Sequence, residues 1–215
     1  MYSFYPQAGL RFNPTFTDLQ FAHFARDVED HAAQMYQIAF AAFARAADSS
    51  QGPTLSRFNF DLLAQAGHDL LLLYRIAGAD SRINEAQVGQ HVNRLFWAII
   101  GATEQLLRFK EESDDWAKDW RSALDRGGLF ARLAVDLALS GAAKGMERDA
   151  MIACLSRLRA SMAGARNYHF YLISEVPEDV DEFVGLADDA GRLSAMFEEA
   201  EVKLRADGAL EAAAA

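Results

Sequence analysis

Apolar side chains recur along most of the chain at alternating spacings of three and four residues, which is the period of one face of an α-helix. A central run begins after Asn84, which can cap the first turn together with Gln87, and Ile83 can pack against Val88. Its stripe consists of Val88, Val92, Leu95, Ile99, Ala102, Leu106 and Phe109. Phe96, Ile100 and Leu107 lie beside that stripe. We therefore predict a long helix that is buried among several partners.

Three further runs with the same spacing predict long helices on either side of the central one. A capping box of Thr17 with Gln20 marks the start of the first run. Gly78 is predicted to stop the second, and Asp207-Gly208 the last. The predicted ranges are 17–48, 57–77 and 177–206.

Between the central run and the last one, breaks in the pattern predict shorter helices. Ser113–Asp115 suits a helix start, because the helix dipole favours carboxylates there. Gly127-Gly128 and Ser140-Gly141 are predicted to end two short helices, and Lys144–Arg166 predicts a further one. Residues 167–174 fit either a short helix or an extended link. We therefore predict an all-α bundle of four long helices, with shorter helices inserted before the last.

The chain predicts one main domain with two short terminal segments. Residues 1–14 are rich in aromatic side chains and predict an arm that lies on the bundle; the open alternative is a segment that only a partner orders. Residues 15–206 contain no internal repeat and no Gly/Ser-rich linker, and predict a single helical-bundle domain. Residues 207–215 predict a frayed tail.

The composition of the chain limits the kinds of partner that it is expected to bind and the cellular compartment in which it is expected to work. A formal net charge of −10 argues against binding to nucleic acid or to an anionic membrane surface. The longest nearly uncharged apolar run, Leu95–Thr103, is too short to span a bilayer, and the first residues lack the features of a signal peptide. The single cysteine, Cys154, excludes an internal disulfide and fits a reducing compartment. We expect a cytoplasmic protein that binds neither nucleic acid nor membrane.

Three polar residues interrupt or border the apolar stripes of three long helices: His31, Asp69 and His91. If these helices meet, the three side chains can converge on one interior site. A buried imidazole or carboxylate must be paired or must bind something, because an unpaired buried charge is costly. One interpretation is a ligand site between helices, and the other is a His–Asp hydrogen bond that sets the register. Because the chain contains neither Glu-x-x-His nor a cysteine pair, we expect no bound metal and no cofactor.

The segment from Arg26 to His31, Arg-Asp-Val-Glu-Asp-His, resembles the short Arg-polar-x-x-x-His motif of HEPN-type ribonucleases. The resemblance covers six residues. Proteins of that family are helical and often dimeric, and the resemblance implies RNA cleavage. In that family the motif usually lies in a late helix, whereas here it lies in the first.

A locally basic stretch extends from Lys144 to Arg166. In an acidic chain we expect Arg157 and Arg159 to pair with acidic runs of the same chain, at 114–119 or 175–181. The open alternative is a site for a phosphate or an acidic partner. Cys154 lies in an apolar helical context and predicts an inert core thiol.

We expect a non-enzymatic protein that acts through protein–protein interaction, as an adaptor, a regulator or an assembly subunit. The candidate interface residues are Trp97, Trp116 and Trp120. Trp97 lies on a polar helix face, where a large aromatic side chain is a common interface anchor, and Trp116 and Trp120 lie on the apolar side of the next predicted helix. Burying the surplus apolar surface of the central helix predicts a homodimer, and a further protein partner stays open. The alternative function is an enzyme or a small-ligand binder with an interior site at His31, Asp69 and His91.

Overall fold

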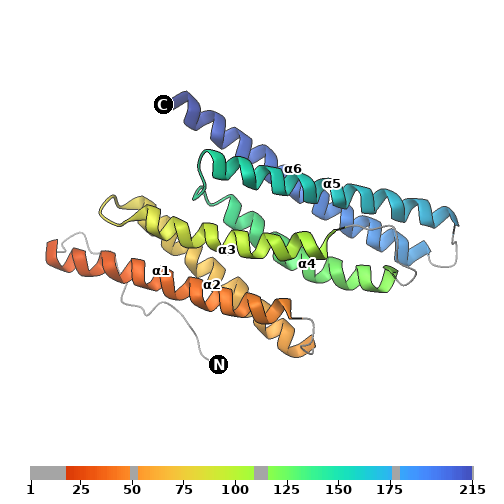
Figure 1. The fold of residues 1–215 in the computed structure, drawn as a ribbon, viewed down its shortest axis with the longest axis horizontal. Coiled ribbons are helices and arrows are strands. Elements are labelled where there is room, and N and C mark those ends of the chain that lie inside the picture. The colour runs from red at the N-terminus through yellow and green to blue at the C-terminus, as the bar shows by residue number, and fades with distance from the viewer. Residues whose placement is uncertain (1–17, 49–52, 109–115, 176–179, 215) are drawn as a thin grey trace. The chain divides into compact units, whose positions relative to one another are not determined.

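The computed structural model describes residues 18–48, 53–108, 116–175 and 180–214, which form six α-helices and no strand (Figure 1). About 91% of these residues are helical, so the all-α class is confirmed. The predicted arm, 1–14, lies outside the described residues. The helices are α1 (Asp18–Ala47), α2 (Pro53–Ala79), α3 (Glu85–Leu106), α4 (Trp116–Ala138), α5 (Met146–Glu175) and α6 (Val180–Ala214). None of the helices in the described ranges is both long and apolar enough to cross a bilayer.

The chain divides into two compact units, Met1–Leu95 and Phe96–Ala215. The first contains α1, α2 and the first half of α3, and the second contains the rest of α3 with α4, α5 and α6. The grouping of the long helices into one bundle, and of 15–206 into one domain, stays a prediction.

Helices α1 and α2 pack side by side in the first unit (Figure 1). The buried face of α1 consists mainly of small side chains: Phe24, Val28, Ala32, Ala39, Ala42 and Ala46. Because alanine has only a methyl group, α2 can approach closely along this face. The larger side chains of the predicted stripe, Met35 and Ile38, are only half-buried at its edge, and so is His31. The predicted stripe was therefore rotated slightly relative to the true contact face.

The start of α3 follows the predicted capping arrangement. The backbone N–H of Gln87 donates to Asn84 Oδ1 at 3.1 Å, and Asn84 Nδ2 donates to Gln87 Oε1 at 3.5 Å. The backbone N–H of Asn84 also donates to Glu29 Oε1 of α1 at 3.0 Å, which ties α1 to this turn. Ile83 and Val88 are both buried, as a hydrophobic staple requires.

Two glycine-containing pairs that were expected to end helices, Gly127-Gly128 and Asp207-Gly208, lie inside them. Helix α4 continues through Gly127-Gly128, and α6 continues through Asp207-Gly208 to Ala214. A Cβ at Gly127 would lie 2.5 Å from Leu107 Cδ2, and one at Gly208 would lie 3.1 Å from Arg148 Nη1. These glycines make room for neighbouring side chains and do not break the helices. The predictions of a short helix ending at 127–128 and of a frayed tail from 207 are therefore wrong.

In the second unit, α5 and α6 lie antiparallel and side by side (Figure 1). The segment 167–174 is neither a short helix nor a link, because α5 extends unbroken from Met146 to Glu175. With α4 and α5 at 23 and 30 residues, the prediction of short inserted helices is wrong. Buried side chains of α5 and α6 keep the three-four spacing: Met151, Leu155, Leu158, Met162, Leu186, Ala190, Leu193, Phe197 and Leu204.

Candidate functional site

The three polar residues that were predicted to converge all belong to the first unit, one each on α1, α2 and α3. His31 is half-buried, and its Nδ1 lies 2.6 Å from the carbonyl O of Asp27, one turn earlier. Asp69 Oδ1 accepts a hydrogen bond from Gln65 Nε2 at 3.1 Å. Within the described part of the chain, no hydrogen bond joins any two of His31, Asp69 and His91. The expected His–Asp hydrogen bond is not formed.

Asp69 Oδ2 and His91 Nδ1 are buried without a hydrogen-bond partner among the described residues. The His91 ring packs on Tyr36, with ring centroids 5.3 Å apart. Burial lowers the pKa of His91 below its ordinary value, and the nearby Arg94 lowers it further, so the ring is neutral at pH 7. A buried polar atom without a partner costs free energy. These two atoms therefore keep hydrogen-bonding capacity for a ligand, and the assignment of a ligand site stays a prediction.

Among the described residues, the structure shows neither a group of side chains that could hold a metal ion nor a hydrogen-bonded pair in the ribonuclease-like motif. No group of three or more His, Cys, Asp or Glu side chains in the described ranges is placed to hold a metal ion. Arg26 is exposed and His31 half-buried on α1, and no described hydrogen bond joins them. The nuclease activity implied by the resemblance stays a prediction.

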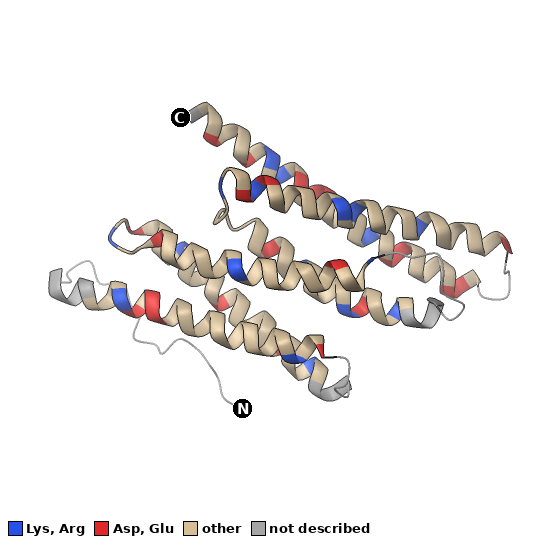
Figure 2. Cartoon of the chain, viewed as in Figure 1, with Lys and Arg blue, Asp and Glu red and all other residues tan. Residues whose placement is uncertain are grey.

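The middle of α1 carries a partly exposed aromatic surface, with Phe40 exposed and Tyr36 and Phe43 half-buried, that sequence reasoning did not single out. The Tyr36 and Phe40 rings lie 6.0 Å apart and the Phe40 and Phe43 rings 6.3 Å apart, centroid to centroid. Phe40 is 42% exposed. Residues 31–44 include no Lys, Arg, Asp or Glu, and this uncharged part of α1 is plain in Figure 2. We call Tyr36, Phe40 and Phe43 the aromatic face of α1; its signal in the sequence was aromatic side chains at i, i+4 and i+7.

The tryptophans expected at an interface differ in exposure. Trp97 is 36% exposed, its indole N–H donates to Glu147 Oε1 at 3.3 Å, and it packs edge-on against Phe96. Trp120 is only 7% exposed and stacks on His169, with ring centroids 6.3 Å apart. Trp120 therefore belongs to the core of the second unit, as its place on the apolar side of its helix predicts, and its role in an interface stays a prediction. The side chain of Trp116 lies outside the described residues.

His169 is a fully buried histidine that sequence reasoning missed. It continues the apolar stripe of α5 through Met162 and Ala165 at spacings of three and four, which was the available signal. Its Nδ1 lies 2.5 Å from the carbonyl O of Ala165. Burial lowers the pKa of His169, and the contact with Ala165 opposes this in part. The imidazole is therefore neutral at pH 7 inside the core.

The basic stretch of α5 pairs within the chain, as expected, although with other partners. Arg157 Nη2 donates to Glu104 Oε1 of α3 at 2.7 Å, and Arg159 Nε donates to Glu201 Oε1 of α6 at 2.8 Å. Sequence reasoning missed these partners because they come from helices that only the fold brings together. Cys154 is buried and accepts a hydrogen bond from Arg157 Nη2. Burial, and then Glu104, raise the pKa of its thiol, so it is a poor nucleophile.

Comparison of the chain with protein-family models, with curated proteins and with solved structures found no match.

Proposed function

We propose that this chain works in the cytoplasm through protein–protein contact and not through catalysis, as one subunit of a homodimer. In this dimer the aromatic face of α1 meets the same face of a second copy. The observation that carries the proposal is the exposed Phe40, which lies between Tyr36 and Phe43 on an uncharged stretch of helix. Aromatic side chains are common anchors of interfaces, and a two-fold dimer lets one patch cover itself.

Charge favours a second copy as the occupant of this face. Two chains of net charge −10 repel each other wherever their acidic surfaces meet. Residues 31–44 form the stretch of α1 that has no charged side chain, so two copies can approach there with the least repulsion (Figure 2). An interface of this kind should tighten with added salt, because salt screens the repulsion between the rest of the two surfaces.

The surface around Trp97 is less suited to a self-contact. The indole N–H of Trp97 already donates to Glu147, so this donor is not available to a partner. Its helical neighbours Arg94, Glu104 and Arg108 are charged, and their pairing across a two-fold axis would require desolvation. The aromatic face of α1 has no charged side chain that would have to be desolvated on self-contact.

Sedimentation velocity at tens of micromolar tests the proposal. We expect the wild type to sediment with twice the mass of one 23.8 kDa chain, and Phe40→Glu to sediment as a monomer. Phe58→Glu is the matched control: Phe58 is 61% exposed in the same unit, but it lies between the exposed charges of Arg57 and Asp61 on α2. A monomeric wild type would refute the dimer. A dimer that survives Phe40→Glu would refute this face, and a dimer lost only in Trp97→Glu would move the interface to Trp97.

A second candidate function is a small-ligand site in the first unit, with or without catalysis. The observation that favours it is the pair of buried atoms without partners, Asp69 Oδ2 and His91 Nδ1. Native mass spectrometry of the purified protein tests it. A bound species that is retained by the wild type and lost in His91→Phe would support this function, and a bare chain in both proteins would argue against it.

A further inference from the structure

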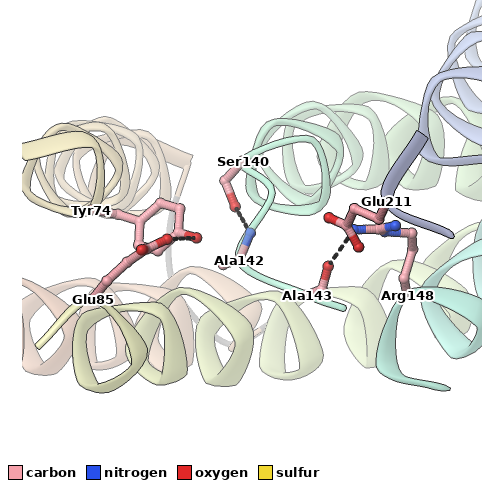
Figure 3. A network of polar contacts seen from close by, with 7 residues as sticks. All are labelled: Tyr74, Glu85, Ser140, Ala142, Ala143, Arg148 and Glu211. Atoms are coloured by element: carbon pink, nitrogen blue, oxygen red, sulfur yellow. Dashed lines mark hydrogen bonds and ion pairs between the residues drawn. The ribbon is translucent and has the colours of Figure 1, made fainter. Parts of the chain in front are cut away.

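Arg148, in the first turn of α5, is a buried cation at one end of the second unit (Figure 3). It is 4% exposed. Its Nη2 donates to the carbonyl O of Ala143 at 3.2 Å and to Glu211 Oε1 of α6 at 2.7 Å. A guanidinium does not lose its proton in a protein, so this site carries a permanent positive charge that must be matched by an anion.

A cavity of about 500 Å³ opens beside this guanidinium. Its apolar wall is formed by Ile152 and Leu204, and the side chains of Asp149 and Arg205 also line it. Gly208 borders the cavity, and a Cβ there would lie 3.1 Å from Arg148 Nη1, so the absence of a side chain lets the guanidinium lie close against α6. The volume lies within the range of small-molecule sites.

The guanidinium keeps donors for a ligand. Both of its hydrogen bonds use Nη2, and among the described residues Nε and Nη1 have no hydrogen-bond partner. A bidentate carboxylate contact pairs Nη2 with either Nε or Nη1, so it becomes possible when Glu211 leaves Nη2. The positive end of the α5 dipole lies in the same turn and also favours an anion.

The anion now at this position is the side chain of Glu211, near the end of α6. Its hydrogen bond with Arg148 lowers the pKa of this carboxyl group, and Lys144 adds to the effect, so Glu211 is a carboxylate at pH 7. Its side chain is about half exposed. It can therefore turn into solvent and leave Arg148 to another carboxylate.

We propose that the cavity beside Arg148 binds a small monocarboxylate with an apolar body, and that Glu211 is a built-in competitor for the same guanidinium. The carboxylate pairs with Arg148, and the apolar body lies against Ile152 and Leu204. Asp149 and Arg205 carry opposite charges at the cavity wall, so Arg148 is left to match one negative charge, which fits a monoanion better than a dicarboxylate or a phosphate monoester. The site does not depend on the dimer proposed above, since it lies wholly within the second unit.

Calorimetric titration with benzoate tests this inference. Benzoate joins a carboxylate to an apolar ring, and benzamide is its neutral counterpart. Glu211→Ala removes the competitor and is expected to bind benzoate at least about tenfold more tightly than the wild type, because more of the protein is then competent to bind. Glu199→Ala is the matched control, since Glu199 is an exposed carboxylate of α6 that pairs with Lys203 away from the cavity. This variant should bind benzoate as the wild type does.

Arg148→Met should abolish binding, and benzamide should not bind any variant. Should Arg148→Met fail to fold, the comparison of benzoate with benzamide in Glu211→Ala still decides whether binding depends on the negative charge of the ligand. Equal benzoate affinities of the wild type and Glu211→Ala would overturn the inference. Absence of binding to Glu211→Ala would also overturn it, and so would benzamide binding as tightly as benzoate.

Discussion

Gly127 of α4 lies directly against Leu107, which follows the last turn of α3: a Cβ at position 127 would be 2.5 Å from Leu107 Cδ2 and 2.7 Å from its Cγ. Leu107 is fully buried, so it cannot withdraw without disturbing its other neighbours. Helix α4 therefore tolerates a poor helix former in its interior in exchange for a close approach to the chain after α3.

This contact predicts that Gly127→Ala destabilises the protein, although alanine is the better helix former. The intrinsic gain of roughly 0.5–1 kcal/mol should be outweighed by an overpacking cost of about 1–3 kcal/mol. Gly101→Ala on α3 is the control, because a Cβ there meets no atom within 4 Å; it should stabilise by up to about 1 kcal/mol. Urea unfolding measures both free energies. Equal stabilisation by the two substitutions would show that the Leu107 side chain moves aside at little cost in free energy.

The difference in burial between two carboxylates of α6 predicts that their removal changes the free energy of unfolding by different amounts. Glu201 is buried and accepts from Arg159 at 2.8 Å, with Arg205 at 3.7 Å, whereas Glu199 pairs with Lys203 on the surface. Glu201→Ala should lower the free energy of unfolding by about 1–3 kcal/mol, because Arg159 loses a charged partner at a partly buried position. Glu199→Ala should leave it unchanged within error. If both variants unfold at the same urea concentration, the Arg159–Glu201 pair contributes no more than a surface pair.

The buried His169 predicts a loss of stability as the pH falls below 6.5. Its pKa in the folded protein lies below the ordinary 6.5, since burial disfavours the imidazolium. As pH falls below 6.5, the unfolded chain binds a proton that the folded chain does not bind. The free energy of unfolding therefore falls, by up to about 1.4 kcal/mol per pH unit, until the folded pKa is reached. His169→Phe should reduce this slope, and replacement of the exposed His68 by Gln should not change it.

Urea unfolding at half-unit steps of pH measures these slopes. The buried ring of His91 contributes in the same direction, so a residual slope should remain in His169→Phe and should disappear in the double variant. Slopes that are identical in wild type and His169→Phe would contradict the assignment of a neutral buried imidazole.

Asp69 was expected to stabilise the fold through a buried partner, and the structure reverses that expectation. Its Oδ2 is buried without a partner, and its Oδ1 is bound only by Gln65, which water can replace. Asp69→Ala should therefore be neutral or stabilise by about 1 kcal/mol, since it removes a desolvated oxygen. Asp61→Ala, at an exposed position of the same helix, is the control. A loss above that of Asp61→Ala in thermal unfolding would show that Asp69 has a partner after all.

Local patterns in the sequence were enough to predict the all-α class and the start of α3. The capping pair Asn84 and Gln87 is a local signal, so the beginning of α3 could be read without knowledge of any other helix. The burial of Val88, Val92 and Leu95 followed from spacing alone, because helical period decides which side chains share a face. The intramolecular pairing of Arg157 and Arg159 followed from net charge.

Only the tertiary structure decided whether a polar or flexible residue marks an end, a contact or a site. Glycine is a common residue at helix ends, but Gly127 and Gly208 lie inside helices, at positions where the side chains of Leu107 and Arg148 come close to the backbone. The spacing of Trp120 places it on an apolar helix face, but only the fold shows that its ring stacks on His169 from another helix. In each case the deciding partner is distant in sequence, and local propensity carries no information about a neighbour that only packing supplies.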